Sequence, residues 1–195
     1  MKIGIMGGTF DPIHIGHLII AEHAREMAEL DEVWFMPSSL PPHKSNDNVT
    51  GASDRLSMVE AATAGNPMFR VCDIELERGG TSYTVETAKA LIGRYPEHRF
   101  SWIIGADMIA YLPNWHRIDE LIQAIGFIGL QRPGYENAAS GLPEALRKSV
   151  HMVVAPQLEI SSTDIRDRIR DGRSVRYLLQ ESVLRIIEEK KLYGS

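Results

Sequence analysis

The opening of the chain changes pattern so sharply that it restricts the fold more than any other stretch. Residues 2–6 are mostly apolar and lead into Gly7-Gly8, which is typical of a buried strand that stops abruptly. Asp11-Pro12 indicates a turn and the first turn of a helix, and apolar residues at helical spacing continue to Met27. A strand, a glycine turn and a helix in this order expose backbone N–H groups at the positive end of a helix dipole, so the stretch predicts an anion site.

Two histidines, His14 and His17, stand three positions apart at the start of the predicted helix and therefore share one face. Gly16 between them leaves room for a ligand to approach the backbone. Three interpretations stay open: two surface histidines, a metal site, or a phosphate site in which both imidazoles donate hydrogen bonds. The metal interpretation is weak because no cysteine or third ligand stands nearby. The stretch lacks the Gly-Lys-Ser/Thr of a Walker loop and the spacing of a dinucleotide-binding fingerprint.

Strand and helix patterns alternate along the rest of the chain. This alternation predicts an α/β fold, a Rossmann-like, doubly wound parallel sheet flanked by helices, within a single domain over residues 1–195. We expect a small C-terminal helical part, from about residue 162, to pack on that domain. The expected strands are 2–8, 32–37, 69–76, 99–107, 125–130 and 150–155, and the expected helices are 15–27, 54–64 with Ser53 as N-cap, 81 or 82 to 94, short helices within 108–124, 144–148, 162–171 and 175–191.

Ligands in sheets of this kind lie outside the carboxyl ends of the strands. This rule brings together residues 7–9, 37–44 and 105–107, which follow three of the predicted strands. The loop over residues 38–51 is long for a compact domain and contains Pro41-Pro42-His43-Lys44, so we expect it to be functional or mobile.

Composition excludes several classes of protein. Of the 195 residues, 44% are apolar, which is enough for a full core, and the net charge of −5 argues against a surface that coats nucleic acid. Cys72 is the only cysteine, so no intramolecular disulfide can form. No apolar run approaches the ~20 residues that span a bilayer, and the N-terminus lacks the features of a secretory signal. We expect a soluble cytoplasmic protein without a membrane or nucleic-acid partner, and the sequence leaves open whether it forms a homo-oligomer.

A second helix start stands at residues 160–166, Ile-Ser-Ser-Thr-Asp-Ile-Arg. One interpretation is an ordinary Ser/Thr cap. The other is a polyphosphate site, because three consecutive hydroxyls exceed what one cap requires. Arg166 would also be unfavourable at the positive end of a helix dipole unless an anion binds there. Together with the histidine pair, this segment would supply a second clamp on a triphosphate.

Both segments resemble known signatures. Residues 8–17, Gly-x-Phe-x-Pro-x-His-x-Gly-His, and residues 160–166 resemble the two signatures of the nucleotidyltransferase superfamily related to class I aminoacyl-tRNA synthetases. Their order, the chain length and the intervening segments resemble the bacterial nicotinate mononucleotide adenylyltransferases over essentially the whole chain. The segments that resemble this family specifically are 41–44, 81–87, 104–107 and 112–116.

The resemblance implies that ATP and nicotinate mononucleotide react to give deamido-NAD and pyrophosphate, with Mg²⁺ arriving on ATP. The mononucleotide phosphate is already an anionic nucleophile, so no general base is needed, and catalysis depends on positioning and charge stabilisation. The resemblance assigns to catalysis His14, His17, Lys44 and Arg166; to ATP binding Gly7, Gly8, Thr9, Phe10, Gly16, Gly105, Asp107, Ser161 and Ser162; and to the pyridine nucleotide Thr84, Trp115 and His116.

Other interpretations stay open for single residues and for the activity. Trp115 could be a core anchor, Thr84 an ordinary helix residue and Asp107 a helix cap. A different transferase of the superfamily, such as one acting on pantetheine phosphate, would share both signatures. A non-catalytic nucleotide-binding regulator would bind ATP without releasing pyrophosphate. The residues that we assign to packing are Trp34, Trp102 and Cys72.

Overall fold

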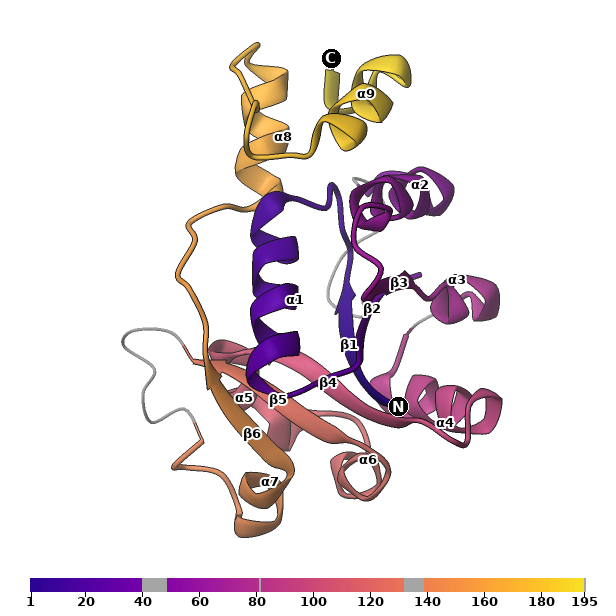
Figure 1. Ribbon diagram of the computed structural model, residues 1–195, viewed down its shortest axis with the longest axis vertical. Helices are drawn as coiled ribbons and strands as arrows, with labels where there is room; N and C mark the ends of the chain where they lie inside the picture. Colours follow the sequence, from indigo (N-terminus) through magenta and orange to yellow (C-terminus); the bar gives the residue numbers. More distant parts are fainter. Residues whose placement is uncertain (40–48, 81, 132–138, 195) are drawn as a thin grey trace.

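The computed structural model describes residues 1–39, 49–80, 82–131 and 139–194, and this part of the chain contributes six strands to one sheet. The strands run in the order β3-β2-β1-β4-β5-β6, and all neighbouring pairs are parallel. The order reverses between β1 and β4, which is the switch point of a doubly wound sheet, so the predicted fold class is confirmed (Figure 1). The strands are β1 (Lys2–Gly8), β2 (Glu32–Pro37), β3 (Phe69–Val71), β4 (Arg99–Gly105), β5 (Gly126–Gln131) and β6 (Val150–Val154).

Helices cover both faces of the sheet, and each face has its own apolar core. Met6 of β1 belongs to one core and its neighbour Ile5 to the other, because successive side chains of a strand point to opposite faces. The residues assigned to packing, Trp34, Trp102 and Cys72, are all buried in the second core, as predicted. The first core is covered by α1 (Ile15–Met27), α2 (Ala52–Thr63), α8 (Ser162–Arg170) and α9 (Glu181–Glu189), and the second by α3 (Ile74–Arg78), α4 (Thr84–Arg94), α5 (Ala106–Tyr111), α6 (Ile118–Ala124) and α7 (Glu144–Ser149).

The predicted strand over residues 69–76 is wrong beyond Val71. β3 lies at the edge of the sheet beside β2, and the last bond between them runs from the Cys72 N–H to the Phe35 carbonyl (2.9 Å). The chain then forms α3, in which the consecutive residues Ile74 and Glu75 are both buried. A strand would turn one of these two side chains outward, so the burial of both is consistent with the helix and not with the predicted strand.

The N-cap of α2 also differs from the prediction. The helix begins at Ala52, and its cap is Gly51 rather than Ser53, because the Gly51 carbonyl accepts hydrogen bonds from the N–H groups of Asp54 and Arg55. The Ser53 carbonyl instead accepts a bond from the Ser57 hydroxyl inside the helix (3.0 Å).

The last predicted helix is shorter than its apolar pattern suggests. α9 begins at Glu181 rather than Val175. Val175 and Leu179 are both buried, but the segment between them is a turn in which the Leu178 N–H donates to the Val175 carbonyl (3.0 Å). The apolar spacing of residues 175–180 therefore reflects a packed turn and not a continuous helix.

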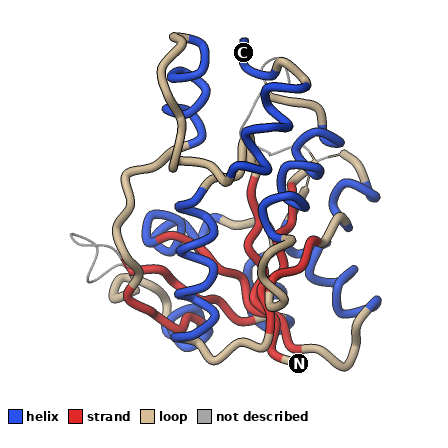
Figure 2. Tube along the Cα trace, turned by 45° about the horizontal axis from the view of Figure 1, so that its top comes forward, coloured by secondary structure: helices blue, strands red, loops and turns tan. Residues whose placement is uncertain are grey.

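The C-terminal helices stand beyond the end of the sheet at which β1 stops (Figure 1). α9 packs on α2, and the Ser182 hydroxyl donates to the Ala61 carbonyl (3.0 Å). The Ile15 N–H at the start of α1 donates to the Leu178 carbonyl (2.9 Å). The N-terminus and the C-terminus lie at opposite ends of the molecule (Figure 2). None of the helices in the described part of the chain combines the length and the apolar composition that a bilayer crossing requires.

Candidate functional site

The two histidines lie against each other at the start of α1. His14 is the N-cap residue of the helix, and its backbone N–H donates to Nδ1 of His17 (3.2 Å). The rings stack with their centroids 3.7 Å apart and their planes inclined by 23°, so they share one face as their spacing predicts. Because Nδ1 of His17 accepts a hydrogen bond, the neutral ring carries its proton on Nε2 and has one N–H donor left for a ligand.

Burial keeps both imidazoles neutral at pH 7. Burial lowers the pKa of His14 to about 4. The pKa of His17 falls to about 3, mainly through burial and further through the charge that His14 would carry. Nδ1 of His14 is buried without a hydrogen-bond partner among the described residues. At the start of α1, a polyphosphate would therefore meet neutral N–H donors and the positive end of the helix.

Gly16 also makes room for other parts of the protein. A Cβ atom at this position would lie 3.1 Å from Nδ1 of His14 and 3.6 Å from Cβ of Ile160. The glycine thus makes room for the His14 ring and for the segment before α8. Gly8 acts in the same way, since a Cβ there would lie 3.1 Å from the Phe10 ring.

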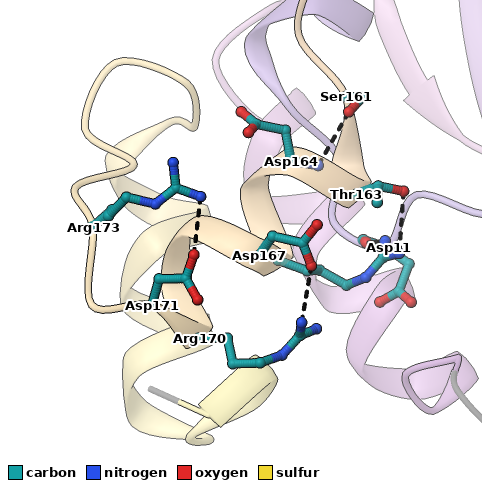
Figure 3. A network of polar contacts seen from close by, with 9 residues as sticks. Asp11, Ser161, Thr163, Asp164, Asp167, Arg170, Asp171 and Arg173 are labelled. Atoms are coloured by element: carbon teal, nitrogen blue, oxygen red, sulfur yellow. Dashed lines mark hydrogen bonds and ion pairs between the residues drawn. The ribbon is translucent and has the colours of Figure 1, made fainter.

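The second helix start docks directly on the turn that follows β1. The Ser162 hydroxyl donates to the Pro12 carbonyl (2.9 Å), and Nη1 of Arg166 donates to the Asp11 carbonyl (2.7 Å). Figure 3 shows Asp11 beside the start of α8. The starts of α1 and α8, far apart in the sequence, therefore meet at one place.

Each of the three hydroxyls in this helix start has a partner within the protein. Ser161 is the ordinary N-cap, because its hydroxyl accepts from the Asp164 N–H (3.1 Å; Figure 3). Ser162 holds the turn after β1, and the Thr163 hydroxyl accepts from Nη2 of Arg166 (3.3 Å). The cap interpretation accounts for Ser161 alone, whereas the other two hydroxyls support the docking of the two helix starts.

A buried arginine that the sequence analysis did not single out braces the same turn. Arg55 of α2 is 2% exposed, and its guanidinium donates to the carbonyls of Thr9 (2.8 Å), Ser38 (2.9 Å) and Thr50 (2.9 Å). Burial lowers the pKa of Arg55, and the negative charge of Asp11 opposes that shift. The only sign of this role in the sequence was the position of Arg55 next to the apolar face of a predicted helix.

A cavity of about 360 Å³ brings together the three residues that the sequence analysis assigned to a pyridine nucleotide. Thr84 begins α4, while Trp115 and His116 follow the 3₁₀ turn η2 (Leu112–Asn114). The cavity is lined by Ser82, Tyr83, Thr84, Met108, Tyr111, Asn114, Trp115 and His116. The sequence analysis gave the other five no role, although Ser82, Tyr83 and Asn114 lie in the segments 81–87 and 112–116 that it singled out. The exposed rings of Tyr83 and Tyr111 (43% and 47%) are seen only in the structure.

Contacts of two kinds hold the walls of this cavity. The ring of Tyr83 lies 4.7 Å from that of His116, and Arg117 forms an exposed ion pair with Glu86 (2.7 Å). Behind the wall, the buried Thr87 hydroxyl donates to Oε1 of Glu75 (2.9 Å), and the Ser82 side chain is also hydrogen-bonded to Glu75. Burial raises the pKa of Glu75, and the hydrogen bonds from Ser82 and Thr87 oppose that shift.

The remaining candidate residues lie at the carboxyl ends of β1 and β4. Gly7 and Gly8 end β1, and Gly105 ends β4 as the N-cap of α5. Asp107 is exposed in the first turn of α5, and a Cβ at Gly105 would lie 2.7 Å from its Oδ1, so the carboxylate folds back over the helix start. Phe10 is 2% exposed and packs edge-on against the His17 ring, with the centroids 5.1 Å apart.

One candidate residue lies outside the described part of the chain: Lys44, with the whole segment 41–44. Among the residues that the structure does describe, no group of three or more His, Cys, Asp or Glu side chains is placed to hold a metal ion. The described part of the site therefore offers an anion N–H donors and a guanidinium, and offers a metal no ligand cage.

This chain is similar in sequence to a protein family and its named members, and similar in fold to solved structures. The family model described as cytidylyltransferase-like matches residues 5–168. A relative from Exiguobacterium sibiricum, named "Probable nicotinate-nucleotide adenylyltransferase", is 51% identical over 195 residues, which cover 100% of both chains. A relative of the same name from Geobacillus kaustophilus is 50% identical over 194 residues, covering 100% of this chain and 87% of the other.

Solved structures share the fold at much lower sequence identity. The nicotinic acid mononucleotide adenylyltransferase of Plasmodium falciparum, complexed with NaAD, superimposes with a TM-score of 0.77 at 20% identity, covering 98% of this chain and 97% of that one. The same Plasmodium falciparum protein complexed with APC gives a TM-score of 0.76 at 19% identity, covering 98% and 96%.

Proposed function

This chain belongs to the cytidylyltransferase-like family and, within it, to the nicotinate-nucleotide adenylyltransferases, so it is a nucleotidyltransferase. From this premise we propose that it transfers the adenylyl group of ATP to nicotinate mononucleotide, giving deamido-NAD and pyrophosphate in NAD biosynthesis. The observation that carries the proposal is the docking of Arg166 and Ser162 on the turn that leads to His14. Two helix starts meet there, and helix starts have the free N–H groups that bind anions.

The proposed reaction needs no proton acceptor on the protein. A phosphate oxygen of nicotinate mononucleotide attacks the α-phosphorus of ATP and forms the new P–O bond. The bond from that phosphorus to the bridging oxygen breaks, and its electron pair leaves with pyrophosphate. Because charge moves onto the leaving group, catalysis requires fixed donors around it.

We assign those donors to the two helix starts. His14 and His17 would donate to the phosphates around the reacting phosphorus. Because their pKa values are low, both rings are neutral at pH 7, and each neutral ring has one N–H donor. Arg166 uses two of its nitrogens on Asp11 and Thr163 and keeps further N–H groups for the pyrophosphate. The remaining ATP contacts that we propose come from Lys44, from Ser161 and Ser162, and from Gly7, Gly8, Thr9, Phe10, Gly16, Gly105 and Asp107.

The cavity beside α4 is the proposed site of the pyridine ring. Trp115 is half-buried there and would stack on the ring. The nicotinate carboxylate would accept hydrogen bonds from Thr84 at the start of α4 and from the backbone of His116. Donors aimed at a carboxylate discriminate against nicotinamide, whose NH₂ group would face other donors.

A divalent metal ion accompanies ATP in this chemistry, and we propose that it is Mg²⁺. Mg²⁺ usually keeps several waters and binds through substrate phosphates, so we expect phosphate oxygens and water to hold it. The residues of the chain would then position the triphosphate rather than the ion. The cytoplasmic location expected from the sequence stays a prediction.

The test is a comparison of pyrophosphate release with three substrates: nicotinate mononucleotide, nicotinamide mononucleotide and phosphopantetheine. We expect the highest kcat/KM with nicotinate mononucleotide. A preference for either other substrate would overturn the proposed specificity. Binding of ATP without pyrophosphate release from any of the three would instead identify a nucleotide-binding regulator.

A further inference from the structure

We propose that Tyr193, near the C-terminal end of the chain, is a positioning residue for adenylyl transfer, because it holds the phosphate-binding turn in place through Asp11. The proposal rests on the function proposed above and adds a residue that lies outside both signatures. Tyr193 belongs to the 3₁₀ turn η3 (Leu192–Gly194), which follows α9.

The phenol of Tyr193 and the carboxylate of Asp11 form a buried bond across the molecule. The Tyr193 hydroxyl donates to Oδ1 of Asp11 at 2.6 Å, although the two residues are 182 positions apart. Asp11 is 4% exposed, and its other oxygen, Oδ2, accepts from the Thr50 N–H (3.3 Å). The side chain of Thr50 is a second hydrogen-bond partner of the phenol. Both carboxylate oxygens are thus bound by the protein, so Asp11 acts on the fold of the turn.

The bond from Tyr193 can influence the reaction because it fixes the position of Asp11. Asp11 lies between the end of β1 and His14, the N-cap of α1. Its backbone carbonyl accepts from Arg166 (2.7 Å), the guanidinium proposed to bind pyrophosphate. A movement of Asp11 would therefore shift the histidine side of the site and the arginine side together.

The environment of Tyr193 keeps its hydroxyl protonated and in place beside Asp11. The ring packs against the core that contains α1 and α8. The residue has a left-handed backbone (φ 61°), a conformation that residues other than glycine rarely adopt without compensating contacts. Burial raises the pKa of the phenol, and the bond to Asp11 raises it further. The hydroxyl therefore stays protonated and donates throughout the working pH range.

Tyr193→Phe removes the donor and keeps the ring. It leaves Oδ1 of Asp11 buried without its partner, which favours a displaced turn. We expect kcat to fall about tenfold or more, because small errors in the position of reacting groups are costly, while the KM for nicotinate mononucleotide changes less than about twofold. The matched control is Tyr177→Phe, the same change at a tyrosine that also has a left-handed backbone (φ 68°) but is 84% exposed.

A double-mutant cycle tests whether Tyr193 acts through Asp11. Asp11→Ala, which removes both acceptor oxygens, should give the same split between kcat and KM, and Tyr193→Phe added to Asp11→Ala should cost much less than it does alone. Asp11→Ala also keeps the proposal testable if Tyr193→Phe does not fold. Additive losses, a Tyr193→Phe enzyme as active as the Tyr177→Phe control, or a loss confined to the KM for nicotinate mononucleotide would each overturn the proposal.

A binding measurement separates this proposal from the function on which it rests. Affinity for a non-hydrolysable ATP analogue, measured by calorimetry, does not depend on the identity of the second substrate. We expect Tyr193→Phe to weaken this binding about threefold or more relative to Tyr177→Phe. If the wild-type chain does not use nicotinate mononucleotide but this difference remains, the proposed function fails and the positioning role stands. Equal analogue affinities of the two variants would count against the role of Tyr193.

Discussion

At the end of the candidate site that is proposed to bind phosphate (the phosphate end), buried side chains fix the backbone. At the end that is proposed to bind the pyridine ring (the pyridine end), the walls of a cavity meet through exposed contacts. Arg55 and Asp11, which are 2% and 4% exposed, hold the turns after β1 and β2. The pyridine cavity has one buried bond behind its wall, from Thr87 to Glu75, and an exposed ion pair between Arg117 and Glu86.

This difference corresponds to what each end would have to do. Stabilising charge on a leaving phosphate requires donors that do not move during the reaction. Selecting a flat ring requires one good surface and a few donors, and the walls can adjust around it. We therefore expect changes at the phosphate end to reduce kcat and changes at the pyridine end to raise the KM for the pyridine substrate.

The sharpest test of the phosphate end is His17→Ala. Loss of one fixed donor to the reacting phosphates should lower kcat about 10²–10³-fold, the cost of removing a preorganised donor. The fold should survive, because His17 lies at the first turn of a helix. His151→Ala, at an exposed position on β6, is the control. A His17→Ala enzyme with turnover close to that of the control would refute the role of the histidine pair.

The stabilities of Arg55→Met and Arg117→Met compare the two ends directly. Arg55→Met leaves three partly buried carbonyls without their donor and should lower the free energy of unfolding by about 3 kcal/mol. Arg117→Met breaks exposed ion pairs and should cost less than about 1 kcal/mol. Denaturant titrations measure both. Equal losses would mean that the buried and exposed contacts do not differ as the comparison requires.

Trp115→Ala tests the pyridine end. Loss of a stacking surface should raise the KM for nicotinate mononucleotide about tenfold, while kcat and the KM for ATP change little. Steady-state kinetics with each substrate varied in turn provides the measurement and its internal control. An unchanged KM for nicotinate mononucleotide would indicate that Trp115 only supports the core through its contact with Phe127 (5.9 Å between ring centroids).

The smallest expected effect is the acid sensitivity of the phosphate end. The pKa values of His14 and His17 lie at about 4 and about 3, below the ordinary 6.5, so in mild acid the unfolded chain binds protons that the folded chain does not. Lowering the pH from 7 to 5.5 should therefore reduce the free energy of unfolding by roughly 1 kcal/mol per histidine. His14→Gln should remove part of this slope; an identical slope in the variant would contradict the neutral state of His14.

Local patterns in the sequence predicted most of the fold and one part of the site. The parallel sheet with helices on both faces follows from alternating strands and helices, although the order of its strands does not, and the shared face of the two histidines follows from a three-residue spacing at a helix start. The meeting of the two helix starts was predicted because both segments have recognisable sequences, whereas the bond from Ser162 to Pro12 that joins them was not.

The residues that hold the site together were not predictable in this way. Arg55, Tyr193 and the carboxylate of Asp11 act through bonds to distant backbone or side-chain atoms, and nothing in their local sequence shows where those partners lie. The misassigned strand at residues 72–76 has a similar cause, because Glu75 is buried by a bond to Thr87 of the next helix. The spacing of apolar residues shows which face of a helix or strand is buried, but not which polar groups are buried with it.

The place of η3 has a practical consequence for handling the protein. Tyr193 stands near the end of the chain and bonds to the turn before His14, whereas Met1 lies at the opposite end of the molecule (Figure 2). An affinity tag or fusion partner joined to the C-terminus would begin beside the proposed catalytic apparatus, so preparations for kinetic work are best tagged ahead of Met1.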